Sequence, residues 1–129
     1  MRNLRERSVE SACSTAIRMK RFTTPTHRFV LEIDPRQWDE FRITYRQAGK
    51  TILERSETDD VNIEVGTTKP TKYTMSFKLT QRETAMFNPN VKVEMQIRYH
   101  YPDGTVDATD VMTANVTDVL NTEILGDED

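Results

Sequence analysis

A strict two-residue alternation of apolar and polar side chains recurs along this chain and limits the folds open to it. The alternation is clearest in "YTMSFKL" (73–79) and "VKVEMQIRY" (91–99), and it recurs over 27–33, 41–57, 61–65 and 106–116. Successive side chains of a β-strand point to opposite faces, so each segment predicts a strand with one apolar and one polar face. Such strands are typical of antiparallel sheets that bury one face and expose the other to solvent.

Turn signals separate these segments at regular intervals. They are "DPRQWDE" (34–40), "QAGK" (47–50), "GTTKPTK" (66–72) and "HYPDGT" (100–105). Asp34 offers a side-chain acceptor, Pro35 fixes φ, and Gly49 permits the positive φ of a hairpin loop. The chain therefore reads as about seven strands, with Phe29, Leu31 and Ile33 facing inward in the first.

Two local features interrupt the strands. Thr80 and Glu83 form a T-x-x-E capping box, which predicts one short helical turn over 81–87. In the last strand Val106, Ala108, Met112, Ala114 and Val116 would share the inward face. That register would place Asp110 inward and Val111 outward, so we expect a β-bulge near 109–111.

Two apolar sheet faces must cover each other, so the fold class predicted is all-β: an antiparallel β-sandwich of immunoglobulin-like type, with about seven strands and one short helical turn. A single closed barrel is the alternative. The chain has only four glycines, and a small coiled barrel needs many at its corners.

A length of 129 residues suits one domain. The sequence divides into a basic N-terminal arm (1–22), a β-sandwich domain (23–125) and an acidic tail (126–129). The arm is either flexible or docked on a partner, and Met19 is an alternative start. The net charge is −3, which disfavours nucleic acid as a partner. A single cysteine, Cys13, excludes an internal disulfide, and no segment reaches transmembrane length, so we expect an intracellular protein without a membrane partner.

No catalytic, cofactor or metal motif stands out, and we expect no enzyme activity and no cofactor. His27 and His100 lack the spacing of metal ligands and are interpreted as exposed residues at strand ends. Asp103, Asp107 and Asp110 lack the spacing of a calcium loop. A phosphate-binding glycine loop and a nucleophile elbow are also missing from the sequence.

Candidate partner contacts lie in the arm, in one loop and near the C-terminus; they are Arg2, Arg5, Arg7, Trp38, Ile124 and Leu125. Trp38 either anchors a partner or closes the edge of the core, and the second interpretation is favoured. In "NVTDVLNTEIL" (115–125) the last two residues are expected to fold back over an open end or edge of the sandwich. The alternative is that they insert into an adjacent subunit.

Three runs carry a family resemblance: "TPTHRFVLEIDPRQWDEFRITYRQAGKTILERS", "FKLTQRETAMF" and "VKVEMQIRYHYPDGTVDATDVMTANVTDVLNTEIL". They resemble small structural proteins of phages and prophages of Gram-positive bacteria, and the N-terminal β-sandwich of siphophage upper baseplate proteins. The resemblance covers residues 23–125 and leaves the 22-residue extension unmatched. It implies a virion structural protein, associated with the tail or baseplate and made in the host bacterial cytoplasm. Its partners would be other virion proteins, within a symmetric homo-oligomer.

Other functions stay open at this point. A module that binds host-surface carbohydrate would need exposed aromatic rings on one face, for which the candidates are Trp38, Tyr45, Tyr99 and Tyr101. A head decoration or neck protein would share the same sequence features. A small accessory enzyme or regulator is the remaining alternative.

Overall fold

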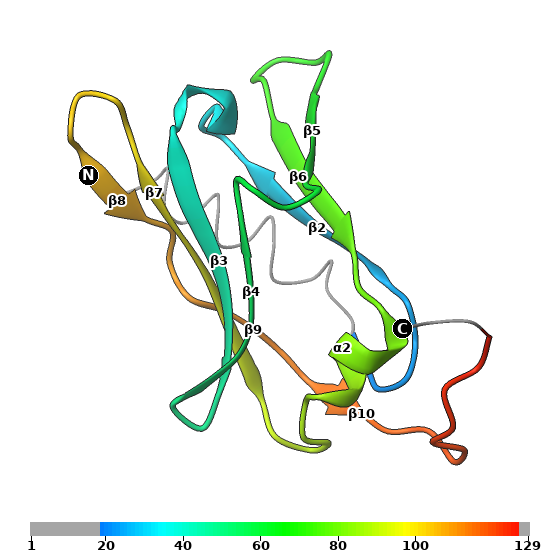
Figure 1. Cartoon of the computed structure of the whole chain (residues 1–129). Helices are drawn as coiled ribbons and strands as arrows, with labels where there is room; N and C mark the ends of the chain where they lie inside the picture. Colours follow the sequence, from blue (N-terminus) through cyan, green and yellow to red (C-terminus); the bar gives the residue numbers. More distant parts are fainter. Residues whose placement is uncertain (1–18, 127–129) are drawn as a thin grey trace.

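The computed structural model describes residues 19–126 as two antiparallel β-sheets that enclose one hydrophobic core (Figure 1). The first sheet has the order β2–β6–β5, and its strands are β2 (Thr26–Leu31), β5 (Asn62–Val65) and β6 (Tyr73–Lys78). The second has the order β4–β3–β7–β8, with β9 also paired to β7; its strands are β3 (Glu40–Gln47), β4 (Lys50–Ser56), β7 (Val93–His100), β8 (Val106–Ala108) and β9 (Met112–Ala114). A parallel pair, β1 (Met19–Lys20) and β10 (Val116–Thr117), closes one end.

This strand order is that of an immunoglobulin-like sandwich, as the sequence predicts. The first sheet corresponds to strands B, E and D of that fold, and the second to C′, C, F and G. The chain crosses from one sheet to the other between β2 and β3, between β4 and β5, and between β6 and β7. A closed barrel, the alternative, is wrong because the two sheets are separate.

The expected bulge is present, and it explains why the return segment is divided into β8 and β9. The register against β7 shifts by one residue between the pair Arg98–Ala108 and the pair Met95–Met112. Thr109 fills the break: its N–H donates to the Ile97 carbonyl at 2.9 Å, and its hydroxyl accepts from the Ile97 N–H at 3.1 Å. The buried backbone of Ile97 therefore keeps both of its hydrogen bonds.

The bulge also reverses which residues face inward, and this corrects one sequence prediction. Val106 was expected in the core, but it pairs with His100, whose side chain faces outward, and it is 50% exposed. Residues directly opposite each other on paired strands share a face. The even positions therefore face inward only after the bulge, from Met112 onward. Val65 was also expected inward and is 43% exposed, because it ends the edge strand β5.

Most of the remaining alternation is buried as predicted, whereas some inward positions are only partly buried, among them Ile33, Val61, Ile63, Tyr73 and Val91. The central inward-facing side chains come from both sheets and are almost fully inaccessible to solvent; they are Phe29, Leu31, Ile43, Tyr45, Met75, Phe77, Leu79, Val93, Met95, Ile97 and Met112. Each large apolar side chain so buried contributes about 1.5–3 kcal/mol relative to an exposed position.

The folded domain begins earlier than residue 23. Met19 is buried in the core, and β1 pairs with β10 through Met19 and Val116. Arg21 fixes this end further, because its guanidinium donates to Asp118 at 3.0 Å and to the Ala85 carbonyl at 2.9 Å. A two-residue strand is too short to show alternation, so the sequence assigned residues 19–22 to the arm.

The predicted helical turn is α2 (Gln81–Ala85), and its capping box is confirmed. The Thr80 hydroxyl accepts from the Glu83 N–H at 3.1 Å, and the Glu83 carboxylate accepts from the Thr80 N–H at 2.9 Å. Asp34 likewise caps the 3-10 turn η1 (Pro35–Gln37) by accepting from the Arg36 N–H at 3.0 Å. Short polar motifs thus define both non-strand elements.

His27 was expected to be exposed, and the structure corrects this. Its ring is buried on β2, and Nδ1 shares a 2.6 Å hydrogen bond with the Tyr45 hydroxyl on β3 of the opposite sheet. The bond therefore crosses the core and joins the two sheets. Burial raises the pKa of Tyr45 well above its usual range, so the phenol stays protonated.

A second buried polar side chain fixes the turn that follows α2. Gln47 donates from Nε2 to the carbonyls of Asn88 at 2.9 Å and Val91 at 2.8 Å, and its Oε1 accepts from the Asn88 N–H at 2.8 Å. The amide is satisfied on both sides, as a buried polar group requires. The β3–β4 hairpin is thereby attached to the start of β7.

The hairpin loop between β3 and β4 contains one strained residue, which gives a stability prediction. Ala48 has φ +49° and Gly49 has φ +79°, the signs of a type I′ turn. A residue with a Cβ is disfavoured at positive φ, so we expect Ala48→Gly to raise the free energy of unfolding by about 1 kcal/mol in urea titrations. Ala85→Gly is the matched control: within α2 it should lower stability by about 1 kcal/mol. A loss of stability in Ala48→Gly would contradict the turn assignment.

Candidate functional site

The loops β2–β3, β5–β6 and β7–β8 lie at one end of the sandwich, and side-chain contacts hold two of these connections in place (Figure 1). Lys72 bridges to Glu32 at 3.0 Å and so connects the β5–β6 and β2–β3 loops. Trp38 stacks on Tyr99 with the ring centroids 4.3 Å apart and an angle of 8° between the planes. These contacts make the loop end an ordered surface.

Trp38, one of the candidate partner contacts, is part of this packing. It is only 8% exposed, and it also meets Phe41 edge-on with the ring centroids 5.9 Å apart. Its indole N–H is buried without a hydrogen-bond partner within residues 19–126, so stacking holds the ring. Trp38 therefore lies at the edge of the core and closes it, which is the interpretation favoured from the sequence. A ring that anchors a partner would need to be exposed.

His100, at the end of β7, lies next to two carboxylates. Its Nδ1 is 2.6 Å from Asp39 Oδ1, and its carbonyl accepts from the Asp39 N–H at 3.0 Å. Glu40 is directly opposite His100 in the strand register. One ligand atom from each of these three side chains lies within 4.8 Å of the others, and this group could hold a divalent cation. The sequence treated His100 as an isolated residue, because Asp39 lies 61 positions away.

The carboxylate of Asp39 determines how His100 titrates. Its hydrogen bond to the imidazole raises the pKa of His100 above the ordinary value, and the negative charges of Asp39, Glu40 and Asp103 act in the same direction. A positive imidazolium is thus favoured in the folded state.

This shift predicts a pH dependence. The pKa of His100 is higher in the folded than in the unfolded protein, so its contribution to stability is complete below the unfolded value of about 6.5 and is lost as pH rises through the folded value. NMR titration of the His100 ring should give a pKa above about 6.5 that falls toward it in Asp39→Asn. Glu123→Gln removes the same charge in the C-terminal segment and should leave the pKa unchanged. An equal fall in both variants would contradict the role of Asp39.

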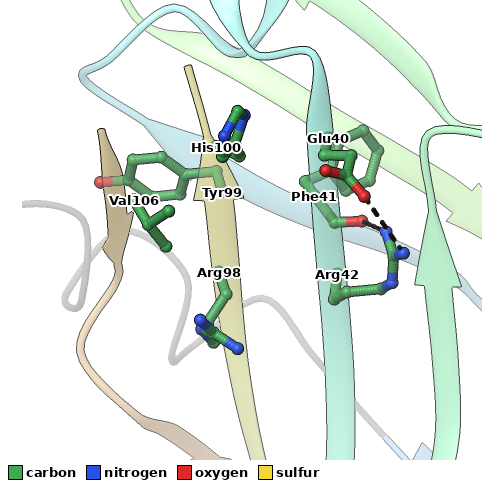
Figure 2. A pocket seen from close by; sticks show the side chains of 7 residues that line it. All are labelled: Glu40, Phe41, Arg42, Arg98, Tyr99, His100 and Val106. Carbon is green, nitrogen blue, oxygen red and sulfur yellow. Dashed lines mark hydrogen bonds and ion pairs between the residues drawn. The ribbon is translucent and has the colours of Figure 1, made fainter. Parts of the chain in front are cut away.

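The outer face of the second sheet is hollowed in two places. One hollow of about 250 Å³ is open to solvent (Figure 2); its lining is Glu40, Phe41, Arg42, Arg98, Tyr99, His100 and Val106. A second hollow of about 150 Å³ is lined by Thr44, Arg46, Thr51, Glu94, Met95, Gln96, Arg98 and Val111. Arg98 lines both hollows, so they are neighbours along β3 and β7, and the pair is here called the depression.

The other candidate contacts lie near the C-terminus or outside the described residues. Ile124 is half-buried, and the Leu125 backbone bonds the side chain of Gln81 on α2: its N–H donates to Oε1 at 2.9 Å, and its carbonyl accepts from Nε2 at 2.6 Å. The segment therefore returns to the domain as expected. The Leu125 side chain, however, is 69% exposed and covers no part of the core, and Leu120 is fully exposed. Arg2, Arg5 and Arg7 lie outside residues 19–126.

The four rings considered for carbohydrate binding do not form an exposed platform. Tyr45 is completely buried, Trp38 and Tyr99 are nearly so, and Tyr101 is partly exposed. Tyr101 meets Tyr99 edge-on with the ring centroids 5.8 Å apart. Three of the four rings are therefore part of the core or its border.

Comparison with known proteins yields no family. No protein-family model matches the chain, and no curated protein matches it either. Among solved structures, it is similar to astrotactin-2, a vertebrate-specific, perforin-like membrane protein, with 12% identity and a TM-score of 0.42 over 74% of this chain and 19% of that one. It is also similar to the V domain of amphioxus IgVJ-C2 (11% identity, TM-score 0.31, 78% of this chain and 99% of that one) and to murine CRIg (14%, 0.36, 78% and 90%).

Within residues 19–126, no helix combines the length and apolar character needed to span a membrane. The longest stretch of helix there is α2, with five residues.

Proposed function

We propose that the chain is a structural protein of a phage virion, associated with the tail or baseplate, which acts by binding other virion proteins. The observation that carries this proposal is the C-terminal segment, residues 118–126. Its backbone is tied to α2 through Gln81, while the side chains of Leu120 and Leu125 are exposed. Burial of an exposed leucine in a partner contributes about 1.5–3 kcal/mol.

The architecture suits assembly in a second respect. Within residues 19–126, the edge strands β5, β4 and β8 have unpaired backbone groups on one side. Such groups can pair with a strand of another subunit. In a symmetric particle each weak contact is repeated, and the repetition supplies avidity without a large interface in any one copy.

The buried polar side chains support a non-catalytic role. His27, Gln47, Thr84 and Thr109 are the buried polar residues within 19–126, and each makes a hydrogen bond that joins structural elements. Thr84, for example, donates to the Thr23 carbonyl at 2.9 Å and accepts from its N–H at 3.1 Å. These groups maintain the fold, which leaves the surface for function.

The phage setting rests on the resemblance of residues 23–125 to small phage structural proteins and baseplate sandwiches. A head decoration or neck protein would use the same kind of contacts, and the location in the particle separates these possibilities. The burial of Trp38, Tyr45 and Tyr99 weighs against carbohydrate binding by the group of rings proposed from the sequence.

Analysis of purified virions tests the proposal. In particles from the phage or induced prophage that encodes this chain, we expect mass spectrometry to find the protein at a copy number that matches a tail or baseplate symmetry. Antibody labelling in electron micrographs should then mark the tail. Labelling of the head or neck would support the decoration or neck alternative, and absence from washed particles would contradict a virion role. A cytosolic host protein measured in the same particles controls for contamination.

A further inference from the structure

We propose that residues 118–129 of one copy dock on the outer face of the β4–β3–β7–β8 sheet of a second copy, in the depression that Arg98 borders. This inference rests on the proposed assembly function and names the partner as another molecule of the same chain.

On the acceptor side, two arginines share the depression. Arg42 and Arg98 are directly opposite each other on β3 and β7, an arrangement of like charges that lowers stability. Arg42 is compensated by Glu57 at 3.1 Å and Glu40 at 3.6 Å, and Figure 2 shows its guanidinium directed toward Glu40. Arg98 has no ion pair or hydrogen bond from its side chain within residues 19–126. An incoming carboxylate would supply the missing partner of Arg98 and offset the repulsion.

Two exposed valines flank Arg98. Val106 lines the larger hollow and is 50% exposed, and Val111 lines the smaller one and is 41% exposed. The depression therefore combines one uncompensated cation with an apolar side chain in each hollow. This combination fits a segment that carries both apolar and acidic side chains.

On the donor side, the sequence "DVLNTEILGDED" (118–129) has that composition. Leu120 and Leu125 are exposed, and Glu123 is exposed without an ion pair in the described part of the chain. Asp127, Glu128 and Asp129 lie beyond the described residues and add three negative charges to the sequence of this segment. The three consecutive carboxylates of this sequence complement the positive charge of Arg98. The two leucines complement the two valines that flank Arg98.

The geometry favours a second copy. The C-terminal segment leaves the domain beside α2 and β10, whereas β8 lies at the opposite end of the molecule (Figure 1). The Leu125 backbone is already bonded to Gln81 on α2, which keeps the segment at its own end of the domain. The four residues beyond Leu125 span at most about 14 Å when extended, so the second copy must lie next to this end of the domain. Because donor and acceptor are different surfaces, the contact can close as a reciprocal two-fold dimer or continue from copy to copy as a ring or a filament.

A charge-swap experiment tests the inference. The full chain should self-associate in analytical ultracentrifugation, with an affinity that falls as salt rises. Two variants, Arg98→Glu and the triple change Asp127→Lys, Glu128→Lys and Asp129→Lys, should each associate at least about tenfold more weakly, because like charges then meet. In an equimolar mixture, the lysines at 127–129 of one variant meet the glutamate at position 98 of the other. The acidic tail of the Arg98→Glu variant likewise meets the unaltered Arg98 of its partner, so association should recover. Arg28→Glu is the matched control: it makes the same charge change on β2, in the other sheet, and should associate like the unaltered chain.

Three outcomes would overturn the inference. They are a chain that stays monomeric at all accessible concentrations, an equal loss in Arg98→Glu and Arg28→Glu, and a mixture that stays as weak as its components. The test needs no phage particle, so its failure can be told apart from a failure of the virion role. A protein that is present in tails but fails the charge swap would keep the proposed function and exclude this interface.

Discussion

Burial of alternate side chains between two sheets is the constraint on which the rest of this structure depends. Apolar residues of β2 and β6 meet those of β3 and β7 in one cluster, with Phe77 in contact with the rings of Phe29 and Tyr45. The single cysteine lies outside the described residues, so packing within 19–126 holds the sheets without a disulfide. The His27–Tyr45 bond adds a polar link between the two layers, and the hydrogen bonds of Gln47 fix the turn before β7 to β3 of the second sheet.

A core formed in this way leaves only the outer faces, edges and ends for function. At the loop end, Trp38 and Tyr99 close the core while Asp39, Glu40 and His100 face solvent. On the outer face of the second sheet, the cross-strand order places Arg98 opposite Arg42. At the other end, α2 holds the backbone of Leu125, whose side chain is exposed. The proposed assembly role uses the last two surfaces.

Features encoded within a few residues were predictable from the sequence. The capping box of Thr80 and Glu83, the cap at Asp34 and the bulge after Ala108 all follow from local patterns. Features that depend on partners distant in sequence were not. β1 is too short to show an alternation of apolar and polar residues. His27 is buried because Tyr45 faces it across the core. Val106 faces outward because the bulge changes which alternate residues point into the core. The candidate site was missed for the same reason: the chain brings Asp39 to His100 and Arg42 to Arg98 only through pairing of β3 with β7.

The measurement that tests the central claim most directly compares two adjacent residues of β9. Met112 is buried between the sheets, and Thr113 is exposed on the outer face. Met112→Asp buries a carboxylate without a partner, which costs enough to remove most of a typical stability of about 5–15 kcal/mol, whereas Thr113→Asp leaves the charge in water. In thermal unfolding followed by circular dichroism, Met112→Asp should lose the cooperative transition and Thr113→Asp should keep it. Equal stability of the two variants, or a greater loss in Thr113→Asp, would contradict the sandwich described here.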